Sequence, residues 1–449
     1  MMQTNELKKT LGPVMLWGLG VGYVISGMYF GWNLGLAEGG TLGLGIATLF
    51  IITMYVCFTF CYTEMACAIP KAGGAFDYAD RALGKKWGFI AGMAQNIEFV
   101  FAPPAIAFAI AAYLNLFIPG DHTILIAIVT YLIFTGVNIV GVRFAATFEL
   151  LITIIAVGEL LLFTGLTLPH VELSNLAVNA LPNGISGIFA AIPFAIWFFL
   201  AIEGVANVAE ETVNPQRNIK LGFGAALATL VTLCILVFIS SVGVNGWESA
   251  VYAAGSTEAQ DTPLVLILST VLGENSPFVH LVAGVGIFGL VASFHGILLA
   301  GGRATFEFGR VGYFPKAMSY IHPKLKTPVV ALLANTAVGI IALFTGKTGD
   351  IITLACFGAI VLYAISMVSF IKLRKEEPEL ARPYRVKHGI LASKVALVIA
   401  VVALVSITIF NLTIAAIFFG IMGVSFIIFN LSDSNRVAEP DQTLVSKTA

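Results

Sequence analysis

Long apolar stretches, separated by short polar segments, recur along almost the whole chain. A bilayer core needs about 20 apolar residues per helix. On that measure the pattern predicts about twelve transmembrane helices and an all-α polytopic membrane protein. The predicted spans cover residues 13–36, 41–69, 88–118, 123–141, 144–168, 185–209, 220–244, 278–306, 328–345, 350–373, 392–410 and 413–431.

Charges between the spans predict the orientation of the chain. With the N-terminus in the cytoplasm, the predicted outside loops hold a single cation, Lys347, and the remaining loop Lys and Arg residues lie inside. The longest outside loop, 245–277, contains four acidic residues and no Lys or Arg. This asymmetry obeys the positive-inside rule. We therefore expect the protein in the inner (cytoplasmic) cell membrane, with both termini in the cytoplasm. The cytoplasmic ends would be a short N-terminal segment, 1–12, and a disordered tail, 432–449.

Composition excludes several other classes of protein. Apolar residues make up 58% of the chain and charged residues 11%, whereas soluble proteins usually carry about 25% charged residues. The net charge of −1 gives no reason to expect nucleic acid as a partner. The chain has no P-loop sequence for ATP, no metal-ligand spacing and no nucleophile motif. We therefore expect that the protein is not an enzyme and needs no cofactor. Its surroundings would be the lipid bilayer.

The first span is rich in glycine, which suggests a helix interrupted within the membrane. It reads GLGVGYVISGMYFGWN, and we place the break at Ile25, Ser26 and Gly27. Irregular backbone survives at membrane depth only where it lines a cavity or is buried in protein, and transporters use such breaks to bind substrate. The alternative is that these small residues only permit close helix packing.

The sixth span is the second predicted break. It has Pro193 early, Gly204 late and the ionisable Glu203 between them. Breaks in the first and sixth spans suggest two five-helix repeats of opposite topology. On this interpretation residues 13–168 form the first repeat and 185–373 the second. Residues 392–431 then form two peripheral helices.

Four strings resemble the amino acid–polyamine–organocation transporter superfamily. They are YTEMACAIPKAGGAFDYADRALG (62–84), AEETVNPQRNI (209–219), GGRATFEFGRVGYFP (301–315) with TP at 327–328, and GVGYVISGMYFG (20–31). The stretch FFLAIEGVANVAEETVNPQRNI looks most like the bacterial ethanolamine permeases. The resemblance implies a LeuT-type fold with a central site between helices 1, 3, 6, 8 and 10.

Two positions depart from what the resemblance implies. The family often has Gly in the sixth-helix break where this chain has Ala201. Some proton-coupled relatives carry a Lys on the fifth helix, and here Ala156 stands at that position, with Glu159 one turn further on. A coupling scheme built on that Lys cannot be transferred. The coupling ion, H⁺ or Na⁺, stays open.

The third span supplies the main predicted partner for a cationic substrate. Glu98 lies midway along it, and Gln95 shares its helix face. A carboxylate at that depth would bind the ammonium of a small amine, while N–H groups near Ser26, Gly27 and Met28 would donate to its hydroxyl. The alternative is a buried Glu98 that pairs with another helix and has no substrate role.

Aromatic and ionisable residues near the sixth-span break complete the predicted site. Trp197 aligns with a tryptophan that stacks on the substrate of an arginine/agmatine exchanger of the superfamily, and Phe199 lies beside it. We assign Glu203 to gating or proton coupling, or alternatively to a structural hydrogen bond with unwound backbone. His295, on the eighth span, is a second titratable candidate, although a lone His on an apolar helix is more often a packing residue.

These observations predict a secondary transporter. The substrate we expect is ethanolamine or a related small primary amine, imported by alternating access. The alternative is an amino-acid or polyamine permease or exchanger of the same architecture. An ion channel or a non-transporting sensor is a more distant alternative. The oligomeric state is left open.

Overall fold

The structure, a computed structural model, describes residues 9–431, except for the side chains of residues 142–146. Its regular elements are all helices, and the only β-pairing in this range consists of two isolated bridges. The tail predicted for 432–449 and residues 1–8 of the predicted N-terminal segment lie outside the described residues. The prediction of an all-helical protein is confirmed.

Ten helical segments of the described range are long and apolar enough to cross a membrane. One of them, 184–211, is a composite of shorter helices. The other nine are α3 (Trp32–Ala68), α5 (Lys85–Asn115), α6 (Thr123–Val140), α7 (Val142–Thr167), α10 (Pro215–Asn245), α13 (Pro277–Arg310), α15 (Thr348–Glu376), α16 (Gly389–Phe410) and α17 (Leu412–Leu431).

Shorter helices complete the predicted set of spans. α1 (Pro13–Val24) and α14 (Val329–Leu343) are apolar but below span length. α1 continues through α2 (Ser26–Tyr29) into the start of α3, which kinks at Gly40, where φ is +64°. The first and second predicted spans therefore meet at this kink, and α14 occupies the ninth.

The connecting segments contain further helices that the apolar pattern did not predict. The long loop 245–277 carries α11 (Glu248–Val251) and α12 (Pro263–Leu272). With only ten residues, α12 is too short to be recognised as a span. The other short elements of connecting segments are α4 (Ala75–Leu83), η1 (Leu168–His170), η2 (Leu173–Ala177) and η4 (Lys316–Ser319). The sixth predicted span is made of α8 (Gly184–Ala190), α9 (Ile192–Trp197) and the 3-10 helix η3 (Ile202–Glu211).

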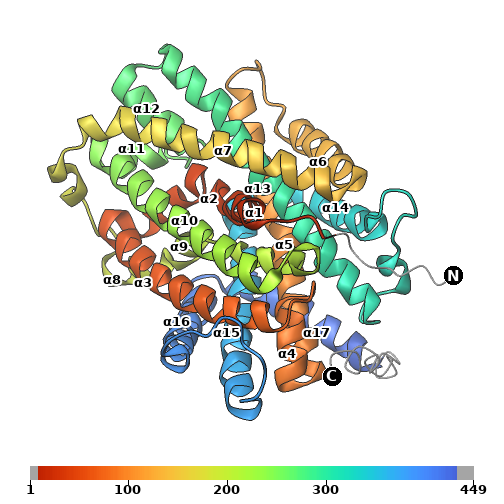
Figure 1. Cartoon of the computed structure of the whole chain (residues 1–449). Coiled ribbons are helices and arrows are strands. Elements are labelled where there is room, and N and C mark those ends of the chain that lie inside the picture. The colour runs from red at the N-terminus through yellow and green to blue at the C-terminus, as the bar shows by residue number, and fades with distance from the viewer. Residues whose placement is uncertain (1–8, 432–449) are drawn as a thin grey trace.

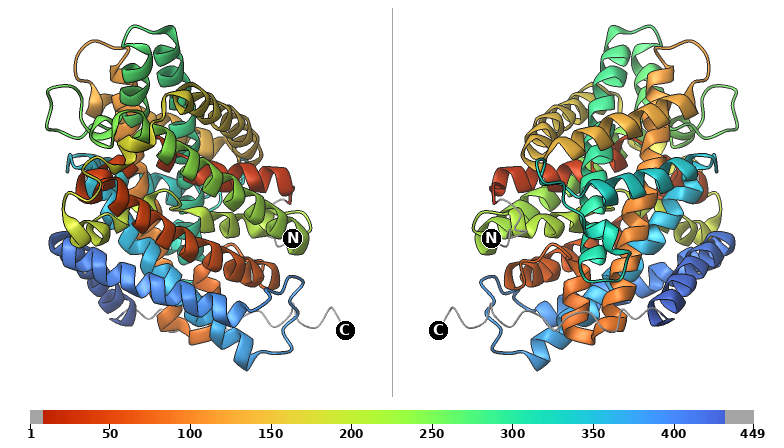
Figure 2. Two further views of the ribbon diagram at one scale, coloured as in Figure 1. Left: turned by 90° about the vertical axis from the view of Figure 1, so that its left-hand side faces the viewer. Right: turned by 90° about the vertical axis from the view of Figure 1, so that its right-hand side faces the viewer.

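Burial separates a central group of helices from a peripheral one. In the most apolar stretch of each helix, 83% of the residues of α15 are buried, 78% of α5 and 72% of α13, against 39% for α16 and 17% for α17. Figure 1 shows α1 near the middle of the bundle, with α7, α10 and α13 around it. Figure 2 shows the last two helices, in blue, along an outer edge. The low burial of α16 and α17 agrees with their predicted peripheral place.

The residues just before α1 are bound to the end of η3. The backbone N–H groups of Thr10 and Leu11 donate to the carbonyl of Glu211, and the N–H of Val213 donates to the carbonyl of Leu11. Leu11 and Thr212 form a parallel bridge. The beginning of the first span and the end of the sixth are thus joined by main-chain hydrogen bonds.

Candidate substrate site

The first span is interrupted twice over a short stretch. Ile25 separates α1 from α2, and after α2 the backbone turns extended at Phe30, with φ −160° and ψ 173°. Gly31 follows with φ +86°, a value that favours glycine. The predicted break at Ile25–Gly27 thus coincides with the milder interruption. The sharper one lies a few residues later, at Phe30 and Gly31.

Protein groups already bind several polar atoms of the first-span break. The N–H of Ser26 donates to Oγ of Ser293 on α13 at 2.8 Å, and that hydroxyl donates to the carbonyl of Gly22 at 2.7 Å. The N–H of Met28 donates to the carbonyl of Ile25. Further along the break, the N–H of Gly31 donates to the side-chain amide oxygen of Asn33 at 3.0 Å. Neutral groups of the protein therefore already accept hydrogen bonds from these three N–H groups.

The sixth span loses its α-helical path over residues 198–201, between α9 and η3. Ala201 is left-handed, with φ +74°. Its N–H donates to Oε1 of Glu98 on α5 at 3.1 Å. A carboxylate that accepts from unwound backbone stabilises a conformation which L-amino acids otherwise avoid. Glu98 is therefore a structural partner of the sixth-span break.

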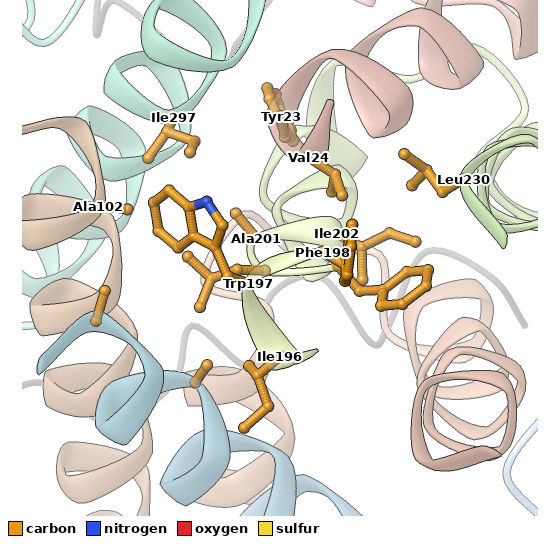
Figure 3. Close-up of a cluster of buried hydrophobic side chains, with 14 of the residues drawn as sticks. Tyr23, Val24, Ala102, Ile196, Trp197, Phe198, Ala201, Ile202, Leu230 and Ile297 are labelled. Carbon is orange, nitrogen blue, oxygen red and sulfur yellow. The ribbon is translucent and has the colours of Figure 1, made fainter. Parts of the chain in front are cut away.

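The two breaks contact each other directly. A Cβ on Gly27 would lie 2.4 Å from the carbonyl oxygen of Trp197 and 2.9 Å from Cα of Phe198. The indole Nε1 of Trp197 donates to the carbonyl of Phe30 at 3.1 Å. Figure 3 shows this indole projecting toward Ala102 and away from the side of Leu230. Only glycine allows the backbones to approach this closely.

The carboxyl groups of Glu98 and Glu203 meet at the sixth-span break. Both side chains are fully buried, and they lie within hydrogen-bond reach of each other. Glu203 also accepts from the hydroxyl of Tyr363 on α15 at 2.8 Å, and that hydroxyl lies 3.2 Å from the hydroxyl of Tyr55 on α3. Oε2 of Glu98 and Oε1 of Glu203 have no donor among the described residues.

An ionised carboxylate has only acceptors. Two carboxyl groups in contact therefore need a proton on one of them or a cation between them. A primary ammonium offers three N–H donors, which suits two carboxyl oxygens that have no donor of their own. The arrangement of Glu98 and Glu203 can hold either a proton or a small amine.

Gln95 and Phe199, which were also predicted near the substrate, contact residues other than Glu98 and Glu203. Gln95 donates to the side-chain oxygen of Asn207 on η3 at 2.7 Å, and Asn207 donates to the carbonyl of Ala72. The ring of Phe199 packs against Tyr55 at 5.2 Å between centroids. Gln95 thus lies on the side of η3 that leads toward α4, while Phe199 is one ring of a buried aromatic cluster.

His295 and two acidic residues of the fifth span make contacts that involve α7, α13 and the first span. Nδ1 of His295 lies 2.8 Å from Oε2 of Glu149 on α7. The hydroxyl of Tyr29, at the first-span break, donates to Glu159 of α7 and lies 3.1 Å from the carbonyl of Ala156. The structure thus supplies a partner for each of the two glutamates.

Sequence reasoning missed several side chains that contact the breaks, among them Tyr55, Ser293 and Tyr363. A tyrosine within an apolar span is usually a packing residue, and nothing in the local pattern distinguishes Tyr363 from one. Ser293 lies two residues before His295 in ASFHG, so a polar pair at this spacing was visible as a signal. Its partner could not be read from the sequence, because the contact joins residues 267 positions apart.

Ion pairs gather at the end of the bundle that carries most of the basic residues. Arg303 of α13 lies 2.6 Å from Glu211 at the end of η3, and both side chains are buried. Arg374 of α15 binds Glu64 of α3 through two hydrogen bonds, and Arg382 also approaches Glu64 at 3.3 Å. These pairs join the sixth span to the eighth and the second span to the tenth. No group of three potential metal-ligating side chains occurs among the residues that the structure describes.

Comparison with known proteins decides the family. The profile of the family described as Amino acid permease matches residues 11–433. The chain belongs to this family. It is 27% identical to the methylthioribose transporter of Bacillus subtilis (strain 168), over 86% of this chain and 85% of that protein. It is 24% identical to a branched-chain amino acid permease of the same organism, over 85% and 84% respectively.

A third relative is the vacuolar cationic amino acid transporter 2 of Arabidopsis thaliana, 26% identical over 84% of this chain and 61% of that protein. Membership of the family implies the LeuT-type fold that the sequence predicted. It makes this permease a multi-pass membrane protein and a secondary transporter, and not an enzyme. The superfamily resemblance is confirmed, while the narrower likeness to ethanolamine permeases stays a prediction.

Proposed function

We propose that this permease imports ethanolamine or a related small primary amine across the inner membrane by alternating access, with both termini in the cytoplasm. The proposal rests on one observation, the meeting of the buried Glu98 and Glu203 carboxyl groups at the sixth-span break. An ammonium bound there would replace the proton or cation that this contact requires. A cation between two buried carboxylates also avoids the cost of unpaired charge within the membrane.

Trp197 and the first-span break would complete the binding site. Once its indole turns away from the carbonyl of Phe30, the face of Trp197 could cover the ammonium, an interaction worth about 2 kcal/mol when desolvated. The hydroxyl of the substrate would lie against the first-span break near Gly27. Gln95, Phe199 and Met28 would then shape the wall of the site.

Partners of the first-span backbone favour a substrate without a carboxylate. A zwitterionic amino acid needs N–H donors for its carboxylate. Here the N–H groups of Ser26, Met28 and Gly31 already have acceptors within the protein. An amine with a hydroxyl needs fewer such donors, so it fits the break with less rearrangement.

Amino-acid transport is the second function to test, because two of the relatives are named as amino acid transporters. The first experiment is a binding screen on purified protein with ethanolamine, choline, a diamine, L-leucine and L-arginine. We expect ethanolamine to bind more tightly than choline, whose quaternary nitrogen has no N–H to donate. If L-leucine binds and ethanolamine does not compete with it, the substrate assignment is wrong.

The second experiment tests Glu98 itself. Glu98→Gln should lower the affinity for ethanolamine by about 10- to 100-fold, because a hydrogen bond to a charged group is worth about 1.5–3 kcal/mol. Glu210→Gln is the matched control, since it makes the same chemical change at a partly exposed position paired with Arg310. Unchanged affinity in a well-folded Glu98→Gln protein would remove Glu98 from the binding site.

A further inference from the structure

Glu149 of α7 and His295 of α13 form a second buried acidic site, which lies against α1. Their side chains are fully buried, and Nδ1 of the imidazole lies 2.8 Å from Oε2 of the carboxyl. The other carboxyl oxygen lies in a space left by two glycines. A Cβ on Gly22 of α1 would come 2.0 Å from this Oε1, and one on Gly296 of α13 would come 3.0 Å from it. The carboxyl therefore rests on the backbone of α1, three residues before the interruption at Ile25.

Two atoms of this pair have no partner among the described residues. They are Oε1 of Glu149 and Nε2 of His295. The imidazole is bordered by the rings of Phe134 and Phe148, with centroids 6.2 Å and 5.5 Å away. A buried polar atom without a hydrogen bond is unfavourable, and here one atom of each residue is in that state.

The number of protons on the pair sets its charge. With one proton, between Nδ1 and Oε2, the pair consists of a carboxylate and a neutral imidazole, and its net charge is −1. A second proton, on Nε2 or on the carboxyl, makes the pair neutral. Because an uncompensated charge within a membrane is unfavourable, uptake of the second proton has a clear physical drive.

Among the residues with described side chains, nearby charged groups do not neutralise the pair. Arg303 of α13 is committed to Glu211 of η3 at 2.6 Å. From α1 the pair faces Tyr23, whose hydroxyl has no partner among the described residues, and α6 contributes the neutral Asn138, which donates to the backbone carbonyl of the histidine. Since the described residues supply no free cation here, a proton can balance Glu149.

The pair is linked to the first-span break through α13. Ser293 precedes His295 by two residues, and its hydroxyl joins the N–H of Ser26 to the carbonyl of Gly22. One short stretch of α13 thus contacts α1 at the break and at the glycine that holds the carboxyl. A tilt of α1 relative to α13 changes both contacts together.

We propose that Glu149 and His295 bind the proton that drives transport, at a site separate from the substrate site at Glu98 and Glu203. This inference rests on the proposed function for the transport step, but proton binding itself does not. Sodium fits less well, because hard cations prefer oxygen ligands and this carboxyl faces an imidazole nitrogen. The hydroxyl nearest to Gly22 on α7, that of Thr153, is hydrogen-bonded to the carbonyl of Gly18 at 3.2 Å.

Infrared difference spectroscopy on the full-length protein in lipid tests proton binding without any substrate. Spectra recorded in acidic and alkaline buffer should contain a carboxylic acid band that Glu149→Gln removes and His295→Gln shifts. Thr164→Val is the matched control on the same helix, since its hydroxyl bonds only the carbonyl of Leu160 in its own helix. If Glu149→Gln and wild-type difference spectra are identical, the pair does not bind the proton and the proposal is overturned.

Vesicles with a pH-sensitive dye inside test the coupling. A pH gradient should drive uptake of labelled ethanolamine together with protons. Glu149→Gln should reduce this accumulation by about tenfold or more, a usual size for coupling between two sites, while exchange of ethanolamine at equal pH stays within about threefold of wild type. A purely structural role would lower exchange and accumulation equally and would overturn the proposal.

Two further results have separate meanings. If accumulation follows a sodium gradient and ignores the pH gradient, the proton assignment is overturned. If the wild-type protein moves no ethanolamine, the proposed function fails, and the infrared result still decides whether Glu149 and His295 bind a proton. In both experiments His295→Gln serves as the second variant should Glu149→Gln fold poorly, as judged by its thermal unfolding.

Discussion

The two helix breaks face each other, yet they satisfy their backbone in different ways. At the first-span break the acceptors of backbone N–H groups are neutral, namely the hydroxyl of Ser293 and the side-chain amide oxygen of Asn33. At the sixth-span break the acceptor is the carboxyl of Glu98, which also touches Glu203. A neutral acceptor satisfies the backbone N–H group and leaves no charge behind. A carboxyl pair leaves a charge that another cation can balance.

Their backbone strain differs as well. The first-span break puts Gly31 at φ +86°, where glycine costs little, whereas the sixth-span break puts Ala201 at φ +74°, where an L-residue is strained by roughly 1–2 kcal/mol. The hydrogen bond from Ala201 to Glu98 offsets part of that strain. We infer that the sixth-span break is the chemically active one and that the first mainly supplies a close-fitting surface.

The largest effect is expected where the two breaks touch. Gly27→Ala places a methyl group 2.4 Å from the carbonyl oxygen of Trp197, which is backbone and cannot rotate away. Overpacking of about 3 kcal/mol corresponds to a loss of roughly 100-fold in transport, measured as uptake into vesicles. Gly158→Ala on α7, where nothing lies within 4 Å, should behave as wild type. Normal uptake by Gly27→Ala would mean that the breaks separate easily.

A smaller effect, confined to the sixth-span break, is expected from its second carboxyl. Glu203→Gln should weaken substrate binding by about 10- to 100-fold, because it removes a charge-assisted contact worth about 1.5–3 kcal/mol. Tyr363→Phe removes only a neutral donor to the same carboxyl and should cost less than about tenfold. Titration calorimetry of both variants measures the difference. Equal losses would argue that Glu203 acts as a structural acceptor only.

The first-span break should respond in stability more than in binding. Ser293→Ala leaves the N–H of Ser26 and the carbonyl of Gly22 without their partner and should reduce the free energy of unfolding by about 1–3 kcal/mol. Substrate affinity should stay within about threefold. Thermal unfolding and binding, measured on the same preparation, separate the two. A loss of affinity as large as that of Glu203→Gln would erase the contrast between the breaks.

The loop that covers the first-span break predicts a pH dependence. Asn33 donates to the carbonyl of Gln260, and Asp261 accepts from Thr348. Burial raises the pKa of Asp261 to about 6. A raised carboxyl pKa stabilises the fold while the group is protonated, so this contribution is lost as pH rises from about 4 through about 6. The melting temperature of Asp261→Asn should therefore exceed that of wild type by a margin that grows over this interval. A constant difference would contradict the assignment.

The smallest effect is expected for Ala201→Gly, which restores the residue that the family often carries. Relief of the left-handed strain is largely cancelled by the extra freedom of glycine in the unfolded chain, so stability should change by less than about 1 kcal/mol. Transport should remain near wild type. Chemical denaturation provides the measurement, with Ala156→Gly as a control in regular helix, which should be destabilised. A large gain in activity would show that the alanine restricts the break.

Much of the fold was predictable from the chain because the membrane imposes one strong rule, a long apolar helix for each crossing. The rule fails for α12, whose ten residues are too few to be recognised as a span. It also misplaces the sharper part of the first break. Several glycines follow one another there, and only Gly31 takes a positive φ. A sequence shows which residues can adopt that angle, not which one does.

The site was predictable in its residue types and not in its pairings. Glu98 and Glu203 were recognised because a carboxyl within a span needs a reason. Their contact joins α5 to η3, and no local pattern encodes it. The same holds for Glu149 and His295, which come together only because glycines in α1 and α13 make room. Trp197 was placed correctly beside the break, while its hydrogen bond to Phe30 depends on the exact unwinding of the first span.

The hydrogen bonds between Leu11 and the end of η3 constrain how the protein can open. Since they are main-chain bonds to Glu211 and Val213, side-chain rearrangement alone cannot release them. If both termini lie in the cytoplasm, as proposed, the joined halves of the first and sixth spans would rotate as one rigid body. A path toward the cytoplasm would then form along the rim of that body, where Arg303 meets Glu211. Cross-linking Leu11 to Thr212 should accordingly leave turnover intact, whereas fastening η3 to α13 should stop it.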